Sequence, residues 1–277
     1  MNATTPKANK SRLAFFLLAI VLIIPFWVYG AMTGIQLLPG IPVAALGTFC
    51  PMLAAIILVY REDKRASVAA LLKRSFDFKR IKAKRWYAPI LLIVPVVMVL
   101  SFAVLRLTGV PVPAPQIAVL PTLALCIVTF IAALGEELGW SGYAIDPMQA
   151  RWGALKAGII LGIFWAVYHY IALLQAHRSV EWIAWWTLYT VAARMIMVWL
   201  FNNTGKSVFG MALFHMTINV TWQLFPVGGS FFDPRVTGLI LAVVAAIVVG
   251  VWGPQMQGQR TSLISIVAGS KETPAIR

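Results

Sequence analysis

Residues 87–105 read YAPILLIVPVVMVLSFAVL, nineteen residues without a charged side chain. As an α-helix rising 1.5 Å per residue, this stretch is about 28 Å long, close to the thickness of a bilayer's hydrocarbon core. Similar runs recur along the chain of 277 residues, which is 60% hydrophobic and 12% charged. Because soluble domains are about 25% charged, the sequence predicts an all-α bundle of transmembrane helices.

The apolar runs predict eight membrane spans with both termini in the cytoplasm. The expected spans are 13–32, 42–60, 87–106, 117–143, 154–175, 182–202, 207–225 and 236–253. With an inside N-terminus, nineteen of the 23 Lys and Arg residues lie in cytoplasmic segments, three lie in outside loops, and Arg194 lies within a span. Cytoplasmic loops are enriched in Lys and Arg, so this distribution supports that orientation. We expect a multi-pass protein of a bacterial plasma membrane.

The longest polar connection is the basic segment 61–86, which carries ten of the Lys and Arg residues. It also contains apolar residues such as Phe76 and Phe78, so we expect a helix that lies on the membrane interface against anionic lipid. The net charge of +14 does not indicate nucleic-acid binding, because the cations lie between apolar runs. Cys50 and Cys126 fall inside such runs and predict neither a disulfide framework nor a Cys-based metal site.

Ionisable residues inside the spans are few and are the best candidates for function, because such groups are costly in hydrocarbon and usually face the bundle interior. They are Glu136, Glu137, His169, Arg194 and His215, and Asn219 joins them as a buried polar group. On straight helices Glu136, the two histidines and Asn219 lie about 12–20 Å from the cytoplasmic ends of their spans. These four groups from three helices are therefore expected to converge in one pocket.

The spacing of these residues predicts which of them share a helix face. His215 and Asn219 are four residues apart, and so are Trp165 and His169, which makes Trp165 a supporting residue of the same site. Adjacent glutamates point about 100° apart on a helix. Only one of the pair can aim at a shared centre, and the other is free to hold a neighbouring helix.

A carboxylate, two histidines and an amide are sufficient for hydrolysis. A glutamate can act as general base on a water, and histidines can hold that water or a divalent metal such as zinc. An amide can donate to the developing oxyanion. Two alternatives stay open from spacing alone, a proton-coupled transporter and a non-catalytic membrane scaffold. A transporter would more often show repeated halves and broken helices, and we find neither in the sequence.

Three short motifs follow one another on separate predicted spans. They read Glu136-Glu137-Leu138-Gly139-Trp140-Ser141, then Trp165-Ala166-Val167-Tyr168-His169, then His215-Met216-Thr217-Ile218-Asn219. In order and placement they resemble the EExxxR, [FW]xxxH and HxxxN motifs of the CPBP family of intramembrane proteases. This family, also called Abi, includes CAAX prenyl proteases and bacteriocin-processing enzymes. The resemblance covers 117–224 as a catalytic core, with N-terminal spans in 1–116 and the last span and a polar tail in 225–277.

The resemblance implies hydrolysis of peptide bonds in membrane-associated substrates, near a prenylated C-terminus or in a leader peptide. It implies that Glu136 activates the attacking water and that His169 assists this water or binds a metal. His215 and Asn219 would hold the metal or the oxyanion, and Glu137 would anchor its surroundings.

One position departs from the family pattern. The place of the motif arginine is taken by Ser141. If that arginine pairs with a glutamate, Arg194 is a candidate substitute, because it is the remaining intramembrane cation. The departure also leaves open a catalytically inactive member of the family.

Overall fold

A computed structural model of the chain describes residues 7–38, 40–226, 229 and 231–257. Within these residues the chain forms eight α-helices, joined by shorter helical segments and one small β-hairpin. The α-helices are α1 (Lys7–Thr33), α2 (Cys50–Lys73), α3 (Tyr87–Leu107), α4 (Val119–Gly139), α5 (Ile145–Gln175), α6 (Val180–Asn203), α7 (Val208–Leu224) and α8 (Pro234–Trp252).

The shorter elements occupy the connections between these helices. They are the antiparallel strands β1 (Gln36–Leu38) and β2 (Ile41–Pro42), the 3-10 helices η1 (Val43–Phe49), η2 (Arg74–Arg80) and η3 (Lys84–Trp86), and the π-helical η4 (Trp140–Ala144). Sequence reasoning did not predict these elements. Three of them matter for function, because η1, η2 and η4 all contact the polar centre of the bundle or the helix ends that carry it.

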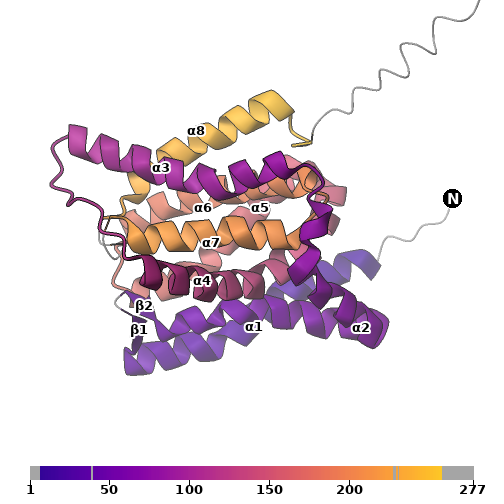
Figure 1. The fold of residues 1–277 in the computed structure, drawn as a ribbon. Helices are drawn as coiled ribbons and strands as arrows, with labels where there is room; N and C mark the ends of the chain where they lie inside the picture. Colours follow the sequence, from indigo (N-terminus) through magenta and orange to yellow (C-terminus); the bar gives the residue numbers. More distant parts are fainter. Residues whose placement is uncertain (1–6, 39, 227–228, 230, 258–277) are drawn as a thin grey trace, which may run out of the picture.

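The long helices lie alongside one another, with α7 in the middle of the bundle (Figure 1). α7 contacts α3, α4 and α6, while α5 packs against α6 and α6 packs against α8. α2 lies against α4 on the side away from α8. The helices that carry the candidate site residues, α4 to α7, therefore form the interior of the fold.

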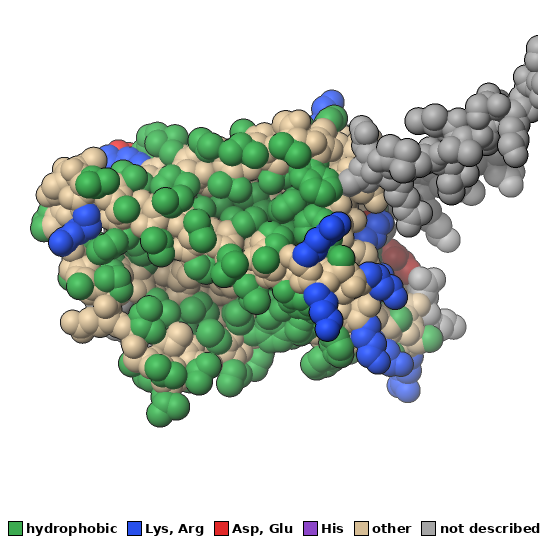
Figure 2. Space-filling view, turned by 45° about the horizontal axis from the view of Figure 1, so that its top comes forward, with side chains coloured by type: hydrophobic (Ala, Val, Ile, Leu, Met, Phe, Trp, Pro, Cys, Tyr) green, Lys and Arg blue, Asp and Glu red, His purple; other side chains and the backbone are tan. Residues whose placement is uncertain are grey.

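The outside of the bundle is apolar, as a membrane protein requires. Large apolar side chains are exposed on most helices, among them Leu13, Leu92, Leu120, Ile163 and Leu239. Figure 2 shows such side chains covering one face, with Lys and Arg gathered mainly at one end. Six helical stretches of the described residues are long and apolar enough to cross a membrane. The predicted fold class, an all-α polytopic membrane bundle, is confirmed.

The number of crossings and the cytoplasmic location of the termini stay predictions. α4, η4 and α5 form one continuous apolar stretch, Val119–Gln175, and α7 has only 17 residues. All eight predicted spans nevertheless correspond to an α-helix. The start of α1 and the end of α8 lie at the same end of the bundle (Figure 1), as an even number of passes requires.

The basic segment 61–86 differs from the expected separate interfacial helix. α2 continues past the expected end of its span at residue 60 as far as Lys73, and η2 and η3 follow it. Residues 61–73 contain Arg, Lys, Glu, Ala and Leu, which favour helix once the chain has left the apolar run. The expectation of an anionic-lipid partner for this segment stays a prediction.

Two glycines allow α4 to approach the start of α2. A Cβ on Gly135 would lie 2.6 Å from the ring of Phe49, and a Cβ on Gly139 would lie 2.6 Å from the carbonyl carbon of Pro51. Real Cβ atoms essentially never come so close, and backbone cannot give way as the end of a side chain can. This approach places Thr48 of η1 within hydrogen-bonding distance of Glu136, near the end of α4.

The substitution Gly139→Ala is therefore expected to destabilise the protein by about 1–3 kcal/mol, as overpacking of a tight core does. Thermal unfolding in detergent measures the effect. Gly250→Ala in α8 is the matched control, because a Cβ there meets nothing within 4 Å, and we expect it to leave the melting temperature unchanged or slightly raised. Equal melting temperatures for the two variants would show that α4 does not depend on this contact.

Candidate active site

The two adjacent glutamates lie in the last turn of α4, inside the bundle. Glu136 is 4% exposed and Glu137 is 0% exposed. The π-helical η4 follows directly, and π-helical turns of this kind are frequent at functional sites. Trp140 Nε1 donates to Glu136 Oε2 at 3.0 Å, and Ser141 Oγ donates to Glu137 Oε2. Each carboxylate is thus held by the residue four positions later.

Glu137 is fully engaged by groups from two further helices besides its own helix turn. Arg194 on α6 donates to both carboxylate oxygens, from Nη1 at 2.9 Å and from Nη2 at 3.0 Å. The Nδ1 of His215 on α7 lies 3.1 Å from Oε1. Bidentate pairs of this kind are strong and orient both partners. Glu137 therefore joins α4, α6 and α7, and Arg194, which is 1% exposed, balances its charge.

Glu136 has one oxygen that is fixed by the protein. Its Oε2 accepts hydrogen bonds from the indole nitrogens of Trp140 at 3.0 Å and Trp165 at 2.7 Å. Its Oε1 accepts a longer bond of 3.2 Å from Thr48 Oγ1 in η1, a hydroxyl that also lies 3.0 Å from the carbonyl oxygen of Ala132. The single hydroxyl proton of Thr48 is shared between two acceptors, so Oε1 retains capacity for a further donor.

Both histidines present Nε2 to this Oε1, at 3.7 Å for His169 and 4.0 Å for His215. Nδ1 of His169 bonds the carbonyl oxygen of Trp165 at 2.8 Å, and Nδ1 of His215 bonds Glu137. A carbonyl and a carboxylate can only accept, so we assign the proton to Nδ1 and a lone pair to Nε2 in each ring. Two lone pairs and a carboxylate oxygen then face one another at distances that suit a bridging water.

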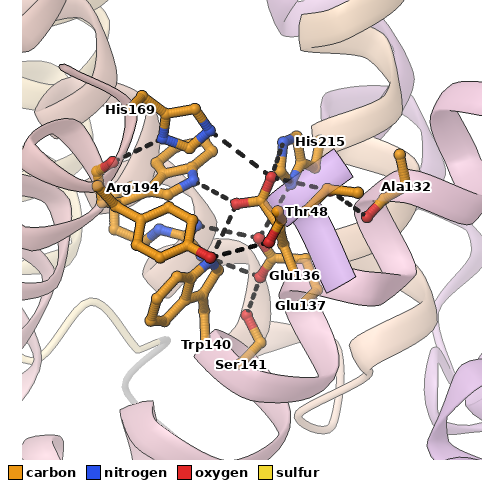
Figure 3. Close-up of polar contacts among 12 residues, drawn as sticks. Thr48, Ala132, Glu136, Glu137, Trp140, Ser141, His169, Arg194 and His215 are labelled. Atoms are coloured by element: carbon orange, nitrogen blue, oxygen red, sulfur yellow. Dashed lines mark hydrogen bonds and ion pairs between the residues drawn. The ribbon is translucent and has the colours of Figure 1, made fainter. Parts of the chain in front are cut away.

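Trp165 connects the two glutamate systems. Its indole bonds Glu136, while the guanidinium of Arg194 lies 4.1 Å from its ring centre and the ring of His215 lies 4.9 Å away. Such cation–π contacts are strengthened where water is excluded. In Figure 3 the carboxylates lie between His169 on one side and His215 on the other. A change at Trp165 would disturb both carboxylates at once.

Three of the four groups expected in one pocket, Glu136, His169 and His215, meet there. Glu137, Arg194 and Trp165 join them in one contact network. The pairing of Arg194 with Glu137 agrees with the idea that it replaces the motif arginine, and Ser141 at the motif position bonds the same carboxylate. Asn219 lies one turn after His215 on α7 and is half-buried. Within the described residues no hydrogen bond joins its amide to the network.

Sequence reasoning missed two partners of Glu136. Trp140 follows Glu136 by four residues, and this spacing could have identified it. Thr48 is an isolated threonine in an apolar run, 88 residues before its partner, and no local signal could have found it.

The metal site that the sequence left open is not formed by the residues as they are arranged. No group of three His, Cys, Asp or Glu side chains in the described ranges is placed to hold a metal ion. Catalytic zinc takes three protein ligands, and the described side chains provide no such set of three. As arranged, the described residues form no three-ligand zinc site, and treatment with a chelator tests whether a metal takes part.

A cavity of about 350 Å³ lies at the other end of the bundle. It is formed where α3 ends and α6 and α8 begin, and its lining includes Leu105, Trp182 and Phe232. None of the candidate site residues lines it. The candidate active site is therefore defined by its polar network and not by this cavity.

Comparisons with known proteins agree with the geometry. Residues 117–221 match the sequence profile of the family described as type II CAAX prenyl endopeptidase Rce1-like. The chain is 27% identical over 260 residues to CAAX prenyl protease 2 of the archaeon Methanococcus maripaludis, and the alignment covers 84% of this chain and 92% of that protein. The resemblance to CAAX-type intramembrane proteases is confirmed. The bacterial plasma membrane stays a prediction, because this relative is archaeal.

Proposed function

We propose that this chain, with its resemblance to type II CAAX prenyl endopeptidases, is an intramembrane endopeptidase in which Glu136 activates the attacking water. The comparisons support an endopeptidase at the coarser level. The observation that carries the finer proposal is the meeting of Glu136 Oε1 with two histidine Nε2 atoms at 3.7 and 4.0 Å. Glu137 is excluded from this task because its oxygens are taken by Arg194, Ser141 and His215.

The reaction that suits this geometry is direct attack of water on the peptide carbonyl. The water donates one hydrogen bond to Glu136 Oε1 and the other to a histidine Nε2. Glu136 takes the first proton as the water oxygen bonds to the carbonyl carbon, which forms a tetrahedral intermediate. The carbon–nitrogen bond then breaks, and the proton on Glu136 passes to the leaving amine. The immediate products are a carboxylic acid and an amine. Transfer of the acid's proton to the amine gives a carboxylate and an ammonium group, so atoms and charge balance.

Asn219 is the side chain that we assign to the oxyanion. It lies one helical turn from His215 and on the same face of α7. Its amide is not engaged by the site residues, so it is free to donate to a substrate. Removing one donor of this kind from an oxyanion site reduces kcat about 10²–10³-fold.

The substrate class that we propose is a membrane-associated peptide. The glutamates end a helix whose outward residues, such as Leu120, Leu123 and Ile127, are exposed and apolar. A substrate that reaches this site from the bilayer carries an apolar segment or a lipid group. A prenylated C-terminus is the first form to test, because the M. maripaludis relative is named for it, and a hydrophobic leader peptide is the second.

A peptide panel tests the proposal with purified protein in detergent. The panel contains a farnesylated peptide, the same peptide without the lipid, and a hydrophobic leader peptide, and mass spectrometry identifies the products. We expect cleavage of one defined bond in a lipid-bearing or hydrophobic peptide. Absence of cleavage throughout, with protein that is shown to be folded, would favour a scaffold or a transporter instead.

Treatment with a chelator is expected to leave this cleavage unchanged, because the proposed water is activated by Glu136 without a metal. The measurement is the initial rate of cleavage before and after incubation with 1,10-phenanthroline at about millimolar concentration. This chelator competes for zinc with the nitrogen and sulfur ligands by which proteins hold it. Loss of activity that zinc restores would contradict the metal-free step. It would leave the endopeptidase assignment intact.

A further inference from the structure

The segment η2 contacts the chain on both sides of the candidate site. Arg74 donates from Nη1 to the carbonyl oxygen of Gly142 at 2.7 Å and from Nη2 to that of Lys206 at 2.8 Å. Gly142 belongs to η4, the turn that follows Glu137. Lys206 belongs to the connection that precedes α7 and therefore His215. One guanidinium thus joins the turn after the glutamates to the turn before the histidine helix.

Asp77, three residues later, caps the N-terminus of α7. Its Oδ1 accepts from Ser207 Oγ at 2.8 Å and from the backbone nitrogen of Phe209 at 3.0 Å, and its Oδ2 accepts from the backbone nitrogen of Val208 at 3.2 Å. The first N–H groups of a helix lack partners within the helix, and a carboxylate there is also favoured by the helix dipole. This cap comes from a segment 130 residues away in sequence.

The contact between η2 and the start of α7 is close. Gly205 has φ +66°, and a Cβ there would lie 2.7 Å from the carbonyl oxygen of Arg80. Arg74 Nε lies 3.7 Å from Asp77 Oδ2, so the two residues also pair with each other. Burial lowers the pKa of Arg74 from its ordinary value, and the carboxylate of Asp77 opposes this change. Both groups belong to the folded interior more than to the basic surface around them.

We propose that Arg74 and Asp77 are positioning residues that set the distance between the glutamates on α4 and His215 on α7. Asp77 fixes where α7 begins, and Arg74 fixes that start relative to η4. The Glu137–His215 bond of 3.1 Å spans the two parts that they join. The effect on catalysis rests on the proposed function, whereas the effect on this bond does not.

The three histidines of the chain allow the bond to be observed without a substrate. Protein with ¹⁵N-labelled histidine is expected to show three sets of ring resonances, from His169, His177 and His215. Arg74→Met and Asp77→Asn are expected to shift those of His215, because its Nδ1–H is bonded to Glu137. His177 precedes α6 at the other end of the bundle, and its resonances serve as the internal reference. Lys79→Met, an exposed neighbour on η2, is the matched control and is expected to shift none.

The same variants are expected to lower kcat about 10- to 100-fold per folded molecule, since small misplacements of reacting groups have effects of this size. KM is expected to change less than about twofold, because neither residue lies in the network around Glu136. Arg74→Lys keeps the positive charge but cannot donate to both carbonyl oxygens as the two guanidinium nitrogens do. Its kcat should therefore lie between those of the wild type and Arg74→Met.

The resonances and kcat together test whether Arg74 and Asp77 position His215 against the glutamates. Unshifted His215 resonances in Arg74→Lys and Asp77→Asn would overturn this inference, even if both variants are less stable. Shifted resonances with unchanged kcat would also overturn it, because the contact would then be structural only. If Arg74→Met does not fold, the two milder variants supply the measurement. If the wild type cleaves no peptide, the proposed function fails, while the resonances still report whether Arg74 and Asp77 set the Glu137–His215 contact.

Discussion

Replacing Glu136 with glutamine is expected to leave the protein folded and to reduce peptide hydrolysis about 10²–10⁴-fold, the usual contribution of a general base. The glutamine oxygen can still accept the indole N–H groups of Trp140 and Trp165 that bond Oε2. Its amide nitrogen then faces the histidines where Oε1 lay. An amide cannot take a proton from water, so the attacking water is held near the carbonyl but is not activated.

The measurement is kcat/KM for the best peptide of the panel, with thermal unfolding as the check on folding. Glu181→Gln is the matched control, because Glu181 is exposed at the other end of the bundle and its ion pair with Arg235 is a surface pair of little energy. We expect full activity for this control. A Glu136→Gln protein that retains more than about one tenth of wild-type activity would remove Glu136 from the role of base.

The second large effect is expected at Arg194. Substitution by glutamine is expected to destabilise the protein by about 3–5 kcal/mol, as removing one partner of a buried ion pair does. The carboxylate of Glu137 would stay buried with its two strongest hydrogen bonds lost. Denaturant or thermal unfolding in detergent measures the loss, and Arg235→Gln, at an exposed arginine, is the control.

A double variant separates the pair from its parts. Glu137→Gln with Arg194→Gln removes both charges, so we expect it to be more stable than Arg194→Gln alone, since no unpaired charge stays buried. Wild-type stability and activity in Arg194→Gln would show that Arg194 does not replace the motif arginine.

The helices could be predicted from the sequence because hydrocarbon demands long apolar runs. The third span was expected at 87–106 and the corresponding α3 is Tyr87–Leu107. The end of α2 was harder to predict from the sequence. A prediction based on apolar runs ends the helix at the first charged residues, whereas a helix in water can continue through Arg, Lys and Glu. The hairpin between α1 and α2 carries no such signal.

The candidate site was predictable as far as local spacing reaches. Buried ionisable residues on three helices identified Glu136, His169 and His215, and a four-residue spacing placed Trp165 beside His169. Which glutamate meets which partner depends on how the helices pack, and only the structure assigns Arg194 to Glu137. Arg74 was missed for the same reason, because its partners are backbone carbonyls 68 and 132 residues away.

The central claim, that Glu136 activates a water and does not itself attack the carbonyl, is tested most directly by single-turnover cleavage in water enriched with ¹⁸O. Mass spectrometry of the N-terminal fragment reads the oxygen in its new carboxylate. Direct attack by water predicts that every product molecule of the first turnover carries one solvent oxygen. An attack by Glu136 would form an anhydride, and its hydrolysis at the enzyme carbonyl would leave unlabelled enzyme oxygen in the product. A substantial unlabelled product fraction in the first turnover would contradict this account.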